Sequence, residues 1–151
     1  MAIPSFSRHG LSLFFLVAAL GAVPTAAALC LDENGVSGYH IPLDKEMRAA
    51  NAIVLGRVTR KKNLFEDPAD PHGITATIYT LQVSHVVRGK SPSMIRIRSE
   101  NDSSRFWMDV GEEYLLFLSR DTQHQGFYFV DDCGNSGVAS KQAPVLHQVE
   151  R

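Results

Sequence analysis

The feature that most constrains the fold is an unbroken series of strand-like segments in the middle of the chain. Each segment is rich in β-branched, aromatic and other apolar residues, and short stretches of turn-forming residues separate them. No helical pattern intervenes, which is typical of antiparallel β-structure built from neighbouring hairpins. The segments that we expect to be strands are 52–60, 74–89, 93–100, 106–108, 114–119 and 127–132.

Residues 93–100 show the strictest alternation of apolar and polar side chains. Ile95 and Ile97 are predicted to face inward, whereas Arg96 and Arg98 are predicted to face outward. This pattern indicates a strand with one buried face and one solvated face. The simplest interpretation of the two arginines is a charged outer surface exposed to solvent.

Two of the segments, 52–60 and 114–119, are apolar on both faces, and Gly56 marks a bulge or bend in the first. Five strands with a bulged first strand favour closure, because a closed sheet leaves no exposed edge. Helical spacing flanks the strands at 42–51 and again at 143–151. We therefore predict a mainly β fold, a five-stranded antiparallel Greek-key barrel with a short N-terminal helix and a C-terminal helix.

Residues 1–28 have the pattern of a secretory signal peptide. Arg8 supplies the positive charge, 11–23 form a short apolar core, and small residues up to Ala28 suit a signal peptidase. The apolar core is shorter than the roughly 20 residues of a membrane-spanning helix, so we expect no membrane span. Cleavage leaves 29–151, the size of one domain, in a secreted or periplasmic protein.

Cys30 lies almost at the start of this mature chain, where three roles compete: lipid attachment, a disulfide or an N-terminal metal ligand. A lipid attachment signal needs a small residue before the cysteine, and Leu29 is not small, so we do not expect a lipoprotein. The mature chain has two cysteines, Cys30 and Cys133. In an oxidising compartment an even number favours pairing, so we predict that they form a disulfide.

The order of several motifs resembles the netrin-like, or tissue-inhibitor-of-metalloproteinase-like, domain family, and in particular its small secreted bacterial members. The resemblance extends over about residues 30–137. It rests on the cysteine near the mature N-terminus and on the order of the segments "RAANAIVLGRVT", "HVVRGK", "MIRIRS", "VGEEYLLFLSRD" and "FYFVDDCGNSG".

This resemblance implies an OB-like barrel with packed helices and a disulfide from the N-terminal segment to a late cysteine, which matches Cys30 and Cys133. In the animal inhibitors of this family, the amine and carbonyl of an N-terminal cysteine chelate the zinc of the target protease. Their Cys-x-Cys start is absent here, because the sequence reads Cys30-Leu31-Asp32. We therefore predict a binding module, with a metalloproteinase inhibitor acting through the ridge around Cys30 as the alternative.

Catalytic patterns are missing from the sequence. The histidines of the mature chain show no familiar metal-ligand spacing, and no serine has the glycine context of a nucleophile elbow. We therefore predict no enzymatic activity and no metal or other cofactor. The histidines are His40, His72, His85, His124 and His147.

The charge of the chain argues against nucleic acid as a partner. The formal net charge is −1, and it becomes −2 when Arg8 leaves with the signal peptide. Nucleic-acid binding normally needs a strongly basic surface. The expected partner of this monomer is instead another exported or envelope protein, with a protease as the alternative. The candidate partner surface comprises Cys30, Leu31, Arg96, Arg98, Trp107 and Tyr128.

Trp107 admits two interpretations. A large aromatic residue after a polar turn can anchor a partner protein. It can equally close the open end of the predicted barrel, and the sequence slightly favours this second role.

Overall fold

The computed structural model describes residues 30–31, 34–35 and 37–151. The predicted signal peptide, residues 1–28, and Leu29 lie outside this part of the chain. Within the described residues, no helix is both long and apolar enough to cross a membrane.

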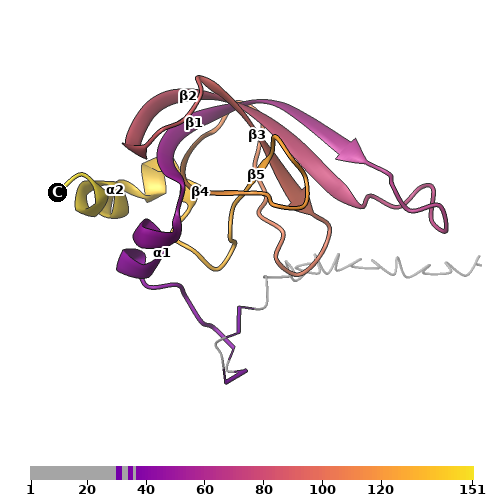
Figure 1. The fold of residues 1–151 in the computed structure, drawn as a ribbon, viewed down its shortest axis with the longest axis horizontal. Coiled ribbons are helices and arrows are strands. Elements are labelled where there is room, and N and C mark those ends of the chain that lie inside the picture. The colour runs from indigo at the N-terminus through magenta and orange to yellow at the C-terminus, as the bar shows by residue number, and fades with distance from the viewer. Residues whose placement is uncertain (1–29, 32–33, 36) are drawn as a thin grey trace, which may run out of the picture.

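The chain folds mainly into β-structure with two short α-helices, as the sequence predicted (Figure 1). The four longer strands and both helices lie within a few residues of their expected positions. The elements in chain order are α1 (Leu43–Ala49), β1 (Ala52–Leu64), β2 (Ala76–Gly89), β3 (Met94–Glu100), β4 (Glu113–Arg120), β5 (Tyr128–Phe129), β6 (Gly137–Val138), a short 3₁₀ turn (Ala139–Lys141) and α2 (Ala143–Val149).

Five of the strands pair in a ring. The order β1-β2-β3-β5-β4 returns to β1 through an additional β1–β4 pairing, and the short β6 pairs with Tyr114 and Leu115 of β4 as a sixth strand. All pairs are antiparallel except β3–β5, which is parallel and consists of the single pair Ile97↔Tyr128. The prediction of a wholly antiparallel sheet is therefore wrong at this position.

The parallel contact follows from the number of strands. Strand directions can alternate around a ring only if the number of strands is even, so a ring of five must contain at least one parallel pair. A parallel pair cannot be joined by a tight hairpin. Here the chain passes through β4 between β3 and β5, and the seam falls where those two strands meet.

Two apolar cores explain why β1 and β4 are apolar on both faces. Alternate residues, such as Val54 and Leu116, point into the ring, where they pack with Tyr79 and Ile97. These four side chains are completely buried. The intervening residues of β1 and β4 must then face outward, as expected from the two-residue period of a strand.

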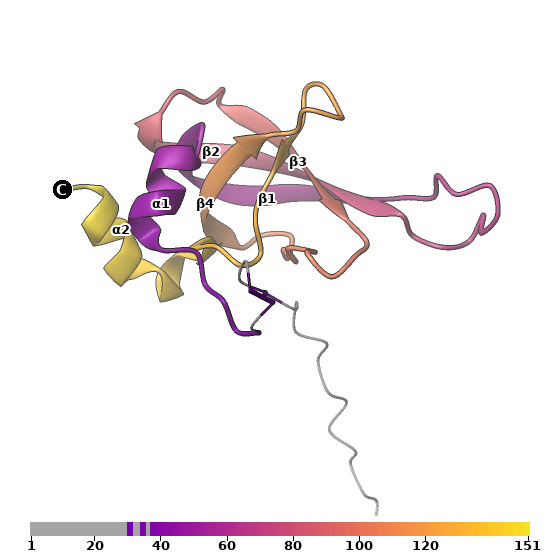
Figure 2. The same cartoon turned by 60° about the horizontal axis from the view of Figure 1, so that its bottom comes forward.

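The outward residues pack against the helices. Ile53, Leu115 and Phe117 form a second core with Met47 of α1 and Val149 of α2. Figure 2 shows the two helices side by side on the same flank of the strands. Both predicted helices therefore owe their stability to one covered face, since seven-residue helices are marginal alone.

The first strand extends further than its pattern suggested. Residues 61–63, predicted as loop, pair with β2, and the ladder reaches Leu64↔Ala76. Figure 1 shows this end of the β1–β2 pair projecting from the ring. A projecting ribbon needs only backbone pairing and has little apolar surface to bury, so its polar sequence resembles a loop.

Two other expected strands are shorter or absent. Residues 127–132 form only the two-residue β5, and Phe106–Met108 is irregular. Phe106 and Met108 are buried in the inner core, whereas Trp107 between them is 58% exposed. The interpretation of Trp107 as a plug is thus wrong, because its neighbours fill the core and its own ring lies at the surface.

Candidate binding site

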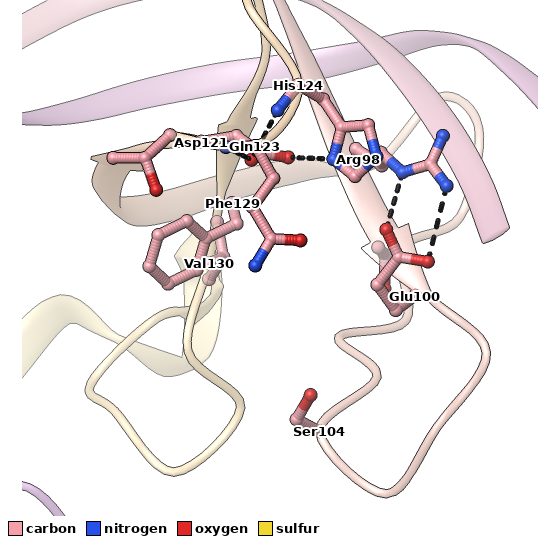
Figure 3. A pocket seen from close by; sticks show the side chains of 10 residues that line it. Arg98, Glu100, Ser104, Asp121, Gln123, His124, Phe129 and Val130 are labelled. Atoms are coloured by element: carbon pink, nitrogen blue, oxygen red, sulfur yellow. Dashed lines mark hydrogen bonds and ion pairs between the residues drawn. The ribbon is translucent and has the colours of Figure 1, made fainter.

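A pocket of about 240 Å³ opens between β3 and the loop that joins β4 to β5 (Figure 3). Its wall combines ionisable side chains with the apolar surface of Phe129 and Val130. The lining residues are Arg98, Ser99, Glu100, Ser104, Asp121, Thr122, Gln123, His124, Phe129 and Val130.

Arg98 organises one side of this pocket. Its Nε donates to Oε1 of Glu100 at 2.5 Å, and its Nη2 donates to Oε2 of Glu66, in the β1–β2 loop, at 2.7 Å. The hydrogen bonds that Arg98 donates to these carboxylates, first to Glu66 and then to Glu100, raise the pKa of Arg98. In turn, the hydrogen bond from Arg98 lowers the pKa of Glu66.

The predicted outward orientation of Arg98 into solvent is wrong, because only 8% of its side chain is exposed. Alternation along β3 correctly put Arg98 on the opposite face from Ile97, which is in the inner core. However, that opposite face is not free here, since the pocket wall and Glu66 surround the guanidinium. The charge is buried with two carboxylate partners, which offsets its desolvation.

The other side of the pocket is a turn built around Asp121. Its Oδ1 accepts hydrogen bonds from the backbone amides of Gln123 and His124, both at 2.8 Å. Its Oδ2 lies 2.9 Å from Nδ1 of His124. Burial alone would raise the pKa of Asp121, but these hydrogen bonds together lower it. The ionised carboxylate can only accept, so Nδ1 of His124 carries the proton.

The two serine hydroxyls of the pocket take part in hydrogen bonds with residues of the β3–β4 connection. Ser99 Oγ donates to the Phe106 carbonyl at 3.1 Å, and Ser104 Oγ donates to Asp102 at 2.7 Å, so both hydroxyls are directed away from His124. No group of three or more potential metal ligands occurs among the residues that the structure describes. The network fixes two loops against β3 and so gives this surface a defined shape.

The N-terminal candidates lie at the disulfide. Cys30 and Cys133 are bonded with their Cα atoms 5.5 Å apart, which confirms the predicted pairing. The Cys30 carbonyl accepts hydrogen bonds from the backbone amides of Gly38 and Tyr39, at 2.9 and 3.1 Å. Leu31, next in the chain, is 48% exposed.

A buried carboxylate secures the segment that follows Cys133. Glu46 of α1 accepts hydrogen bonds through Oε2 from the backbone amide and the side-chain amide of Asn135, at 2.6 and 2.7 Å. Oε1 of Glu46 lies against Gly134, where an added Cβ would be only 2.0 Å away. Desolvation by burial raises the pKa of Glu46. Glycine is thus required at position 134 for close packing, not for its backbone angle.

The predicted partner surface is not one continuous site. Arg96 and Tyr128 line a second cavity on the other side of Asp121, while Arg98 belongs to the first pocket. Trp107 lies in the β3–β4 connection, with cations over its ring, and Cys30 and Leu31 belong to the disulfide region. The structure brings together only Arg96 with Tyr128 and Cys30 with Leu31.

Several residues of the candidate sites were not predicted from the sequence, because they become neighbours only on folding. Lys61 and Arg105 flank Trp107, although Lys61 is more than 40 residues away along the chain. Glu66, in the β1–β2 loop, precedes Arg98 by 32 residues and contacts it only in the folded chain. The spacing Asp121-x-x-His124 is the one sequence pattern that could have indicated such a contact, because aspartate often hydrogen-bonds to backbone amides of its own turn.

The Arg98 network predicts a measurable cost for a conservative change. Arg98→Lys keeps the charge but lacks the planar fork that binds Glu100 and Glu66 together. We expect the free energy of unfolding in urea to fall by about 1 kcal/mol. Arg88→Lys, at an exposed arginine of β2, is the matched control and should change nothing. Equal stabilities for the two variants would contradict this role of Arg98.

Comparisons with known proteins identify no family for this chain. Neither a scan against protein-family models nor a search of curated proteins found a match.

Proposed function

We propose that this protein is an exported, non-enzymatic binding module with an OB-like, TIMP-like barrel, and that its partner is another exported or envelope protein. The ring of five paired strands with helices packed outside it supports the OB-like fold. OB folds bind ligands through their second and third strands and through the loops after strands 1 and 4. The candidate pocket supports this comparison, because it lies on β3 and the β4–β5 loop, and its Arg98 is bonded to Glu66 of the β1–β2 loop.

The observation that carries the proposal is that the side chain of Trp107 is exposed and has two cations beside its ring. Its ring is 58% exposed, yet Lys61 Nζ and the Arg105 guanidinium lie 4.9 and 4.5 Å from its centroid. Neither cation forms a salt bridge in the described part of the chain. Exposed tryptophans next to arginines are typical of the residues that dominate protein interfaces. Holding the ring in place beforehand also lowers the entropic cost of binding.

The inhibitor alternative requires the amine and carbonyl of Cys30 to reach a zinc ion. The Cys30 carbonyl already accepts two backbone hydrogen bonds, from Gly38 and Tyr39. A carbonyl oxygen has two lone pairs, so zinc binding would have to displace at least one of these bonds. This arrangement favours a binding module without zinc chelation.

Site-specific photocrosslinking in the native host tests the proposal. A photoreactive phenylalanine analogue at position 107 is expected to yield one crosslinked product of defined mass in the exported fraction. The same analogue at Gln148, an exposed position on α2, is the control and should yield none. No crosslink at 107, or the same products at both positions, would refute a binding role for Trp107.

A further inference from the structure

We propose that the groove between β3 and the β4–β5 loop docks an extended, acidic peptide segment of the partner, an inference that rests on the proposed binding function. The groove encloses about 520 Å³, more than twice the volume of the pocket beside it. Its walls are divided between apolar and basic side chains. The lining residues are Pro92, Met94, Ile95, Arg96, Arg120, Asp121, Gln125, Gly126, Phe127 and Tyr128.

The groove exists because the parallel seam of the ring is so short. β3 pairs with β5 only at Ile97↔Tyr128, whereas its other edge pairs with β2 over seven residues from Ala76↔Glu100 to Gln82↔Met94. The residues of β3 before Ile97 therefore have a strand neighbour on one side and the groove on the other. Such an edge is a template for an added strand, because its outward backbone groups can pair with an extended chain.

Arg96 is the residue that gives this edge its specificity. Its guanidinium lies 4.4 Å from the centroid of the Phe127 ring. Its Nη2 atom lies 3.3 Å from the position that a Cβ on Gly126 would take. The guanidinium thus lies against an aromatic ring and the neighbouring glycine, and it forms no salt bridge with any described residue. A fixed arginine without an acidic partner is suited to bind a carboxylate in a bidentate manner.

A second arginine strengthens the positive potential of the groove. The Arg120 side chain also lines it and likewise forms no salt bridge with any described residue. Asp121 is the one carboxylate of the lining, and both of its oxygens are occupied by Gln123 and His124 of its own turn. A free carboxylate from outside therefore finds two arginines that form no salt bridge with any described residue, and the lining keeps a net positive charge beside the ionised Asp121.

The shape and chemistry select an extended peptide that combines acidic and apolar residues. Alternate side chains of an added strand point to opposite faces. Met94, which is 58% exposed, shares a face of β3 with Arg96, and Tyr128 pairs with Arg120 and so shares its face. Each set of peptide side chains can therefore meet one arginine and one apolar side chain. A helical segment cannot pair with the strand edge, and a basic segment is repelled by the arginines.

Fluorescence anisotropy with a labelled decapeptide in which pairs of glutamates alternate with pairs of valines tests this inference, because each face of this strand presents both residue types. We expect saturable binding to the oxidised mature protein, and Kd should rise at least about tenfold in Arg96→Glu and in Arg120→Glu. Arg88→Glu, on β2 outside the groove, is the matched control and should bind within about twofold of the wild type. A lysine–valine decapeptide should not bind.

Equal affinity of the wild type and both groove variants, or equal binding of the basic peptide, would overturn the proposal. Thermal melts identify any variant that fails to fold. In the unmodified protein, amide shifts at Met94, Arg96 and Tyr128 on peptide addition report the same site independently, and their absence would also overturn it. If the peptide does not bind but the crosslink at position 107 forms, only the groove proposal is rejected. If the peptide binds but no crosslink forms, only the role of Trp107 is rejected.

Discussion

Opening the disulfide by Cys133→Ser is expected to lower the free energy of unfolding by about 4 kcal/mol. The bond closes a loop with a sequence separation of 103 residues, almost the whole of the described chain. A crosslink of this span removes many conformations from the unfolded ensemble, and the effect grows with loop length. Such a loss is comparable to the entire stability of a small domain. Urea unfolding followed by circular dichroism, with and without reductant, measures it.

Cys30→Ser provides the control, because either substitution opens the same bond. The two single variants and the double variant should be equally destabilised, and reductant should affect the wild type alone. Before global unfolding, proteolysis should become faster between Cys30 and Tyr39. The hydrogen bonds from Ile41 and His40 to the Cys133 carbonyl hold the chain only beyond that point. An unchanged melting temperature for Cys133→Ser would refute the structural role of the bond.

Gly134→Ala should destabilise the protein by about 3 kcal/mol, almost as much as Glu46→Ala. The alanine Cβ would lie 2.0 Å from Oε1 of Glu46, so the carboxylate must leave its place. Its departure breaks both hydrogen bonds to Asn135, one from a buried backbone amide. Each bond to a charged acceptor is worth about 1.5–3 kcal/mol, which sets the scale of both effects. Thermal and urea unfolding measure the losses.

The double variant decides whether this mechanism is right. Once Glu46 is alanine, a methyl group at Gly134 meets no carboxylate, so the two losses should not add and their coupling should reach about 2 kcal/mol. Glu46→Gln is the matched variant that keeps an acceptor for Asn135 and removes the charge. Additive losses in Glu46→Ala/Gly134→Ala would show that the glycine is needed for another reason.

The buried Glu46 carboxyl also predicts how the stability of the protein changes with pH. Burial raises the pKa of Glu46 above its ordinary value of 4.5, so the folded protein binds this proton more tightly than the unfolded chain does. The contribution of Glu46 to stability therefore becomes more favourable as the pH falls through its folded pKa towards 4.5. Glu46→Gln should lose this component of the pH profile.

Much of the secondary structure could be predicted because it depends on local patterns. The two-residue period placed β3, and the double apolar faces of β1 and β4 indicated strands covered on both sides. The Cys30–Cys133 bond was also predictable, since two cysteines allow only one intramolecular pairing.

The candidate sites could be predicted from the sequence only in part. Arg98 has the pattern of an outward residue, but Glu66 and the pocket wall enclose it. Trp107 was a candidate from the sequence, but its flanking Lys61 comes from a ribbon that resembled a loop. Glu46 and Gly134 carried no signal for their contact. In each case the decisive partner is remote in sequence, and periodicity describes only one element at a time.

By itself, the sequence determined which segments become strands, which faces of those strands are apolar, and which cysteines pair. The tertiary structure alone decided the closure of five strands into a ring, with its parallel seam at Ile97↔Tyr128 and the groove beside it. The physical reason is that side-chain alternation records the burial of each strand face. It contains no information about which strand lies next to which, and neighbouring strands create the sites.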